Sequence, residues 1–179
     1  MEVDHSDYLK LLRKLRELPK VKKVFIRSGI RFDYLMADKD DTFFKELCEH
    51  HISGQLKVAP EHTSDKVLFC MRKPSFKLFE AFKREFDYIN RKHGLNQQLI
   101  PYFISSHPNC TEEDMAELAC ITKNLNFKLE QIQDFTPTPM TLSTEIYYTG
   151  IHPYTLEKVW TPRSQQQKLE QRKFFFWYK

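Results

Sequence analysis

Four cysteines are the residues that most directly suggest metal or iron–sulfur chemistry, but their spacing argues against a shared site. They occur at Cys48, Cys70, Cys110 and Cys120, so consecutive cysteines are separated by 22, 40 and 10 positions. Thiolate ligands of iron–sulfur clusters usually include several cysteines from one short loop. We therefore expect this chain to hold no cluster by itself, and we predict no metal site.

Two histidines and one carboxylate are better placed for chemistry, because they follow predicted strands. His62 and His107 have ordinary pKa values near ~6.5, where an imidazole can exchange protons with a substrate, so both are candidates to face substrate. Together with Glu61 they also allow an alternative, a cluster-free enzyme that uses acid–base groups.

Alternating strand and helix patterns supply the elements that must position these residues. The predicted strands are residues 21–28, 55–59, 98–105 and 130–136, and the predicted helices are residues 4–18, one beginning at Asp40 or Asp41, 74–93, and one beginning at Thr111. Repeated strand–helix units give parallel strands joined by right-handed crossovers. The strand ends carry residues 28–29, 60–65, 106–110 and 137–140, which would meet at one edge where ligands bind.

A doubly wound sheet and a partial TIM-like (β/α) barrel of about four parallel strands both fit this order. Polar residues within the strands favour the barrel, whose interior faces a polar substrate; they are Gln98, Tyr102, Gln131 and Gln133. The first predicted helix has no strand before it, so we expect the fold to require a preceding part of a longer protein.

Periodicity and capping signals define the helices more closely. In the first helix, Ser6 is the predicted N-cap, and one face carries Tyr8, Leu11, Leu12, Leu15 and Leu18. The second predicted helix has a stripe of Phe44, Leu47, Cys48 and His51. The third turns Phe79, Phe82, Phe86 and Ile89 inward and stops at Gly94. Thr111 and Asp114 form a capping-box pair for the fourth.

The C-terminal region is less regular. Residues 141–150 predict a turn followed by a short extended piece. Thr161 and Pro162 predict the start of a last helix, which runs into the aromatic residues 174–178. We therefore divide the chain into residues 1–150, part of a barrel, and residues 151–179, a C-terminal extension helix.

Composition indicates an ordinary globular protein of 179 residues, with 41% hydrophobic and 29% charged residues. The formal charge of +4 is a mild excess, whereas nucleic-acid binders concentrate charge on one face, so we expect no nucleic-acid partner. No apolar run approaches the ~20 residues that cross a bilayer. Scattered cysteines without a secretory leader predict a cytoplasmic protein with reduced thiols.

Several segments, in order, resemble radical S-adenosylmethionine (SAM) enzymes. PEHTSDKVLFCMRK resembles their fourth-strand segment, SSHPNCTEEDM the turn after the fifth strand, and DFTPTPMTLSTEIYYTG the sixth-strand segment. RSGIRFDYLM and YTLEKVWTPRSQQQKLEQRKFFFWY narrow the resemblance to the YgiQ-type radical SAM proteins. The resemblance covers residues 22–178.

The resemblance implies that the chain is the C-terminal half of a radical SAM domain. The complete parent would hold a 4Fe–4S cluster and cleave SAM reductively to a 5′-deoxyadenosyl radical. The missing N-terminal half would supply the cluster cysteines as the natural partner of this chain, which would be inactive alone. Exposed strand edges would also promote self-association.

Five residues match SAM-binding positions of the family. Glu61 and Ser64 would approach the SAM ribose or amino-acid part, and Arg72 would bind the SAM carboxylate. Ser105 and Ser106 would pass the adenine or methionine moiety. Plain alternatives exist for each: a solvated loop acid, a helix cap, an arginine at a helix C-terminus, and turn residues. The resemblance identifies no catalytic residue.

A second function class is a non-enzymatic binding protein that contacts RNA through the C-terminal helix. Aromatic residues 174–178 would offer stacking faces. The phosphate contacts would come from Arg163, Lys168, Arg172, Lys173 and Lys179. The alternative for this helix is a surface that packs against another part of the protein.

Overall fold

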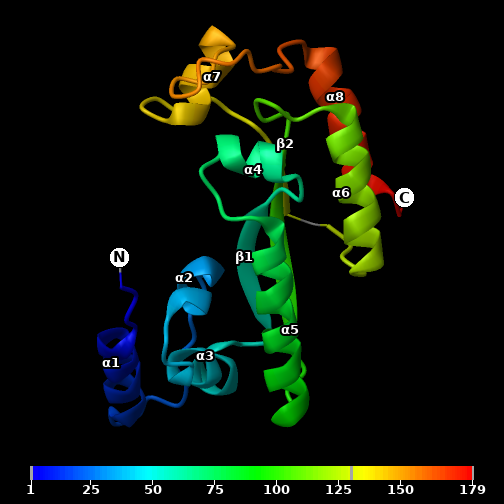
Figure 1. The fold of residues 1–179 in the computed structure, drawn as a ribbon. Coiled ribbons are helices and arrows are strands. Elements are labelled where there is room, and N and C mark those ends of the chain that lie inside the picture. Colours follow the sequence, from blue (N-terminus) through cyan, green and yellow to red (C-terminus); the bar gives the residue numbers. More distant parts are fainter. Residues whose placement is uncertain (1, 130, 179) are drawn as a thin grey trace. The chain divides into compact units, whose positions relative to one another are not determined.

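The computed structural model describes residues 2–129 and 131–178 and shows a mixed α/β protein (Figure 1). The chain forms two compact units, Met1–Ala59 with Lys77–Ile100, and Pro60–Phe76 with Pro101–Lys179. The elements are α1 (Ser6–Glu17), α2 (Phe32–Ala37), α3 (Thr42–Glu46), the π-helix η1 (Leu47–His51), β1 (Gln55–Glu61), α4 (Asp65–Cys70), α5 (Phe76–Lys92), β2 (Gln98–Ser105), α6 (Glu112–Asn124), β3 (Gln131–Asp134), α7 (Leu142–Thr149), α8 (Gln165–Lys173) and the 3₁₀ turn η2 (Phe174–Phe176). The predicted division at residue 150 stays a prediction.

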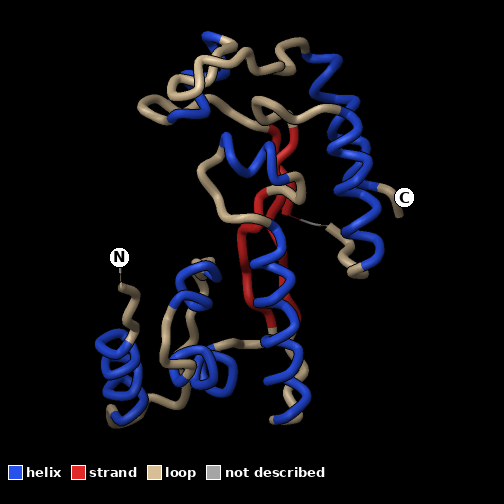
Figure 2. The backbone as a smooth tube through the Cα atoms, viewed as in Figure 1, coloured by secondary structure: helices blue, strands red, loops and turns tan. Residues whose placement is uncertain are grey.

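The three strands form one parallel sheet in the order β1-β2-β3 (Figure 2). The β2–β3 register runs from Tyr102 opposite Gln131 to Ser105 opposite Asp134. The predicted strands at 55–59 and 98–105 are confirmed, and the predicted 130–136 strand corresponds to β3, although Glu130 lies outside the described residues. The α/β class is confirmed in this coarse form, with three strands among the described residues.

The predicted strand at residues 21–28 is wrong. Most of this segment is extended without a ladder, and the pairing nearby is a single parallel bridge between Ile30 and Val58. Val21 and Phe25 are 37% and 40% exposed. The β-branched and aromatic residues that predicted a strand need a partner strand and a buried face, and here these side chains have no such face.

Aromatic packing forms the core of the first unit. The predicted inward face of α5 is confirmed, since Phe79, Phe82 and Phe86 are buried. Phe82 stacks on Phe44 of α3 with ring centroids 5.2 Å apart, and Phe32 of α2 meets Phe79 edge-on at 5.5 Å. Aromatic pairs in these geometries stabilise a core beyond the area that they bury.

Helix α1 forms where it was expected, but its predicted cap is wrong, and of its predicted inward face Leu12 is buried. Its N-cap is His5, and Ser6 instead donates its backbone N–H to Asp4 at 2.7 Å. Leu9 and Leu12 are the buried residues of α1, whereas Tyr8, Leu11 and Leu18 are exposed. Leucines occur at five positions around this segment, so periodicity alone could select the wrong face.

Caps define the helices of the second unit. The predicted capping box of α6 is confirmed, with Asp114 and Thr111 bonded reciprocally. The extended piece predicted at 141–150 is instead helix α7, capped by Thr141 and ended by Gly150 at φ 70°. The last helix begins three residues later than predicted, because Ser164 forms a capping box with Gln167. Helices α6 and α8 lie side by side (Figure 1).

Across the part of the chain that the structure describes, no helix combines the length and apolar character needed to cross a membrane. The longest helix, α5, has 17 residues and a charged outer face.

Phe82→Ala should destabilise the chain by about 3–5 kcal/mol, because it removes a fully buried ring and leaves a cavity. The control is Tyr88→Ala on the same helix, where the side chain is exposed, and this change should cost less than about 1 kcal/mol. Urea unfolding followed by circular dichroism measures both. Equal losses for the two variants would contradict the packing described for α5.

Candidate functional site

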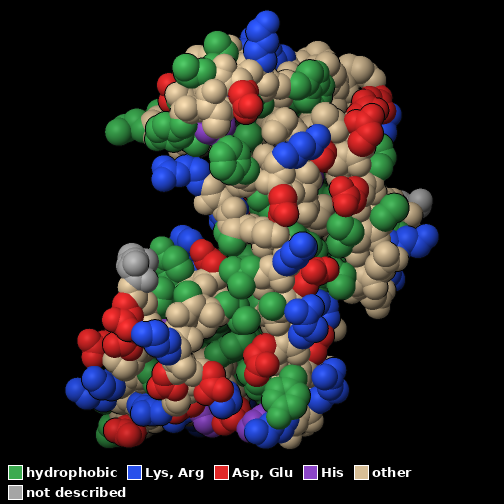
Figure 3. Space-filling model, in the orientation of Figure 1, with side chains coloured by type: hydrophobic (Ala, Val, Ile, Leu, Met, Phe, Trp, Pro, Cys, Tyr) green, Lys and Arg blue, Asp and Glu red, His purple; other side chains and the backbone are tan. Residues whose placement is uncertain are grey.

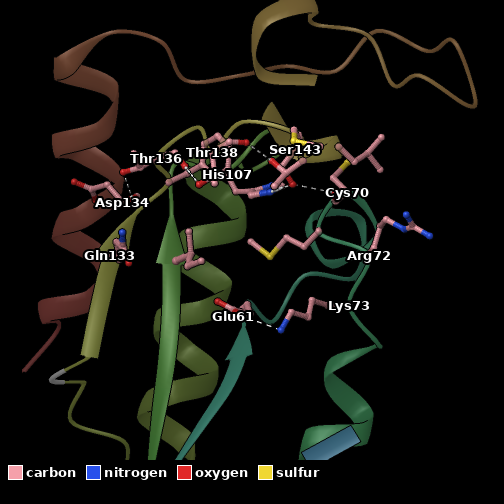
Figure 4. A pocket seen from close by; sticks show the side chains of 16 residues that line it. Glu61, Cys70, Arg72, Lys73, His107, Gln133, Asp134, Thr136, Thr138 and Ser143 are labelled. Atoms are coloured by element: carbon pink, nitrogen blue, oxygen red, sulfur yellow. Dashed lines mark hydrogen bonds and ion pairs between the residues drawn. The ribbon is translucent and has the colours of Figure 1, made fainter. Parts of the chain in front are cut away.

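A cavity of about 520 Å³ lies at the carboxyl ends of the strands, within the second unit. Glu61 ends β1, Asp134 ends β3, and both line the cavity with Ile104 of β2 (Figure 4). The remaining walls come from the end of α4 and from the segment that leads into α7. Parallel strands place such residues at one edge, as expected, so the cavity occupies the position where ligands bind in α/β folds.

Glu61 is the most unusual carboxylate of this cavity. Its Oε1 forms an ion pair with Lys73 Nζ at a distance of 3.2 Å. Its Oε2 is buried without a hydrogen-bond partner among the described residues. Burial raises the pKa of Glu61, and the nearby Lys73 opposes that rise. A buried oxygen without a partner is costly, so Glu61 is suited to accept a hydrogen bond from a ligand.

The backbone is strained around the same cavity. Glu61, Arg72 and Met140 all line it and all have positive φ, at 68°, 56° and 66°. Residues other than glycine adopt a positive φ only at a cost in conformational free energy, and residues in such conformations cluster at functional sites. Arg72 lies at the rim, where its guanidinium points away from Glu61 (Figure 4).

His107 is buried on one wall of the cavity and is held in a single tautomer. Its Nδ1 donates to the Pro108 carbonyl at 2.9 Å, because a carbonyl can only accept. Its Nε2 therefore accepts from the Ser143 hydroxyl at 2.8 Å. Burial lowers the pKa of His107 to about 4. At neutral pH it is an uncharged acceptor that holds Ser143 at the cavity wall.

The other predicted SAM-binding residues do not line this cavity. Ser64 donates its hydroxyl to Asp114 at 2.9 Å. Ser105 is buried and donates to Asp134 at 2.6 Å, so it contacts a cavity residue from behind. Ser106 donates its N–H to Gln171 at 2.8 Å, and its hydroxyl is buried without a partner among the described residues.

His62 lies in an internal network instead of on the cavity wall. Its Nδ1 accepts from the Ser64 N–H at 3.0 Å, so its Nε2–H points to Cys110 Sγ at 3.4 Å. Burial lowers the pKa of His62 to about 3 and raises that of Cys110 to about 12. Both groups are neutral at neutral pH. Of the three residues in the alternative of a cluster-free acid–base enzyme, Glu61 and His107 line one cavity, whereas His62 does not.

The polar residues of the cavity that sequence reasoning missed include Lys73, Asp134 and Ser143. The rule that strand ends carry functional groups could have found Asp134, which is the last residue of β3. Lys73 and Ser143 carry no such signal, because their place depends on how the α4 end and the start of α7 fold back onto the strands.

The described part of the chain contains no group of three or more histidine, cysteine, aspartate or glutamate side chains placed to hold a metal ion. All four cysteines are free thiols. Cys70 lines the cavity, and its carbonyl oxygen lies 3.3 Å from Ser143 Oγ, whose single proton goes to His107. Burial raises the pKa of the Cys70 thiol.

The C-terminal aromatic residues pack against the chain rather than forming a stacking surface. Phe175 is fully buried, and the Tyr178 hydroxyl donates to the Leu129 carbonyl at 2.9 Å. Arg172 and Lys173 make ion pairs with Asp134 and Glu170. On the face shown in Figure 3, positive and negative side chains are interleaved. These contacts favour the packing interpretation of this helix.

Residues 130–179 match a family model described as a domain of unknown function (DUF3362). Over its length the chain is also similar to UPF0313 proteins. It is 59% identical to one from Porphyromonas gingivalis over 187 aligned residues, 100% of this chain and 30% of the relative. It is 58% identical to one from Bacteroides thetaiotaomicron, in an alignment that covers 98% of this chain and 30% of the relative. It is also 58% identical to one from Clostridium perfringens, with 96% of this chain and 26% of the relative covered.

The chain thus spans about 30% of the length of the first two of these relatives. It aligns with one part of these longer UPF0313 proteins, which agrees with the prediction that it is part of a larger protein. The closer resemblance, to YgiQ-type radical SAM proteins, remains a proposal.

The burial of His107 predicts how stability depends on pH. Its ordinary pKa is 6.5 and its folded value is about 4, so the unfolded chain binds the proton more readily. Stability is therefore full above about pH 6.5 and is lost as the pH falls toward 4. Between pH 7 and 5 the loss from this one group is about 2 kcal/mol.

Urea unfolding at both pH values tests this, with His107→Gln as the variant. Glutamine keeps a hydrogen-bonding group without titrating, so the variant should lose about 2 kcal/mol less than the wild type between pH 7 and 5. His50→Gln, at a half-exposed histidine, is the control and should behave as the wild type. An unchanged pH dependence in His107→Gln would show that His107 is not held neutral.

Proposed function

We propose that this chain forms the part of a radical SAM enzyme that holds SAM and substrate at the carboxyl ends of its strands. In this proposal the three parallel strands belong to a (β/α) barrel completed by other parts of the longer UPF0313 protein. Those parts would also carry the cysteines of a 4Fe–4S cluster. The observation that carries the proposal is the buried, unpartnered Oε2 of Glu61 in the cavity at the strand ends.

The chemistry of the cavity fits SAM in two respects. SAM carries hydroxyl and ammonium donors together with a carboxylate, and the cavity offers a carboxylate with a free acceptor and an arginine at its rim. Its volume of about 520 Å³ lies within the ~300–1,000 Å³ that small-molecule sites occupy. Ser64, Ser105 and Ser106 fit less well, because they act behind the cavity wall.

Each cavity residue then has a definite task. Glu61 would accept from the ribose hydroxyls or the ammonium group, and the ion pair with Lys73 opposes the rise in the pKa of Glu61 that burial causes. Arg72 would bind the carboxylate in the bidentate geometry that a guanidinium allows. His107 positions the Ser143 hydroxyl without carrying charge.

Bound SAM, with a cluster held elsewhere in the longer protein, would supply radical chemistry. The residues of this chain contribute orientation and exclusion of water. Asp134, which is fixed by Ser105 at 2.6 Å and approached by Arg172 at 3.4 Å, would face the substrate from the end of β3.

The test is SAM binding to the chain by calorimetry. We expect weak binding, since one part of the barrel is present, and about tenfold to hundredfold weaker binding in Glu61→Gln, which loses a charge-assisted hydrogen bond worth about 1.5–3 kcal/mol. Arg72→Ala should act in the same direction. Glu112→Gln, an exposed acid in the first turn of α6, is the control.

Two results would contradict the proposal. One is no detectable binding of SAM by the wild-type chain at millimolar concentration. The other is binding that Glu61→Gln and Arg72→Ala leave unchanged, which would place SAM outside this cavity.

A further inference from the structure

A second cavity, of about 430 Å³, adjoins the first within the same unit. The two share four residues as a common wall: Arg72, Met140, Thr141 and Leu142. The second cavity adds residues from α7 and from the loop after it: Thr144, Glu145, Tyr148 and Tyr154. A ligand in the second cavity would therefore lie beside one in the candidate SAM site, with these four residues between them.

Two tyrosines give this cavity exposed aromatic faces. Tyr148 and Tyr154 are 68% and 75% exposed. Aromatic rings at the surface that are backed by ordered structure are suited to stack on planar ligands. Both tyrosines thus have most of their surface open to a ligand that enters the cavity.

The backbone behind these tyrosines is fixed. Arg163 donates to the carbonyls of Tyr147 and Tyr148 at 2.9 and 3.0 Å. His152 is buried and stacks on Phe69, with ring centroids 5.3 Å apart. The same His152 ring lies 5.9 Å from that of Tyr154 and accepts from its N–H at 3.4 Å. The tyrosines are therefore held in place while their rings stay accessible.

The charged groups of the cavity have opposite signs and are not used within the chain. Among the described residues, neither Arg72 nor Glu145 makes an ion pair, and their side chains do not bond to each other. A guanidinium matches the geometry of a phosphate. A carboxylate accepts from the amino group of a base, as it does from cytosine in DNA recognition.

We propose that this second cavity binds a nucleotide, whose base stacks on Tyr148 or Tyr154 and donates to Glu145. Its phosphate binds the edge of the Arg72 guanidinium that the SAM carboxylate leaves free, since the five N–H donors of an arginine lie along more than one edge. A base with an exocyclic amino group beside a ring N–H, such as guanine, suits the carboxylate of Glu145 best. The inference rests on the proposed function in one respect, that the nucleotide is the substrate presented to the adjoining SAM site.

Calorimetric titration of the full chain with guanosine 5′-monophosphate (GMP) tests this. Guanosine, which lacks the phosphate, and inosine 5′-monophosphate, which lacks the amino group, should each bind at least about fivefold more weakly, and inorganic phosphate alone weaker still. Tyr154→Ala and Glu145→Gln should weaken GMP binding by a similar factor. Tyr88→Ala, an exposed tyrosine on α5 outside this unit, should not.

Three results would overturn the inference: no binding of GMP at millimolar concentration, equal binding of N-acetyltryptophanamide, or displacement of GMP by saturating SAM with loss of binding in Glu61→Gln. The last would place GMP in the first cavity.

The two proposals fail separately. SAM binding that depends on Glu61 without any GMP binding removes only the nucleotide site, whereas GMP binding that depends on Tyr154 and Glu145 without any SAM binding removes the SAM site and leaves the nucleotide site standing.

Discussion

The buried carboxylate of Asp114 is the interaction on which the candidate site depends. It accepts from Ser64 Oγ at 2.9 Å and from Lys66 Nζ at 2.8 Å, both in the segment that follows β1. It also accepts from the Thr111 N–H and hydroxyl at 2.8 Å, in the segment that follows β2. One carboxylate thereby joins the loops after two strands. Burial disfavours its charge, but the bonds from Lys66, Thr111 and Ser64 outweigh burial and hold the pKa of Asp114 below its ordinary value.

This junction has consequences for the rest of the unit. A buried carboxylate with its donors in place is stable, whereas removal of one donor leaves a buried acceptor unsatisfied and costs about 1–3 kcal/mol. The two loops must therefore stay together, which keeps Glu61 and His107 on the walls of the same cavity. The network of His62 and Cys110 fills the space beside Asp114 with neutral groups.

A fixed junction also explains how strained backbone persists nearby. Glu61, Arg72, Ser106 and Met140 all have positive φ, at a cost of about 1–3 kcal/mol for each residue in such a conformation. The hydrogen bonds around them hold these conformations, as when Ser106 donates to Gln171 and Gln171 donates to the Cys110 carbonyl at 2.6 Å. Of these residues, Glu61, Arg72 and Met140 line the cavity.

Local signals predicted the parts of the fold that local physics decides. The aromatic stripe of α5, the capping box of α6 and the alternating burial of β2 each follow from residues close in sequence. The predictions for residues 21–28 and 141–150 were wrong because β-branched and aromatic residues there favoured extended structure. Residues 21–28 find only a single bridge nearby instead of a partner strand. Residues 142–149 form a helix because Thr141 caps it and Gly150 ends it.

The candidate site was predicted in outline and not in detail, for a similar reason. The strand-end rule located Glu61 and His107, which line the cavity. The same rule also selected His62, and the family resemblance selected Ser64, Ser105 and Ser106. Neither signal shows which neighbouring side chains turn into the cavity. Lys73 and Ser143 enter through contacts between segments distant in sequence, such as Ser143 with His107, 36 positions apart.

Photoaffinity labelling tests the central claim, that SAM binds in the cavity at the strand ends. The chain is irradiated with 8-azido-SAM, and the labelled peptides are identified by mass spectrometry. The account predicts labels on peptides that contain residues 61–73, 104–107 or 133–143, which carry the cavity lining, and loss of these labels in excess SAM. Labels confined to other peptides, or labels that excess SAM does not reduce, would contradict it.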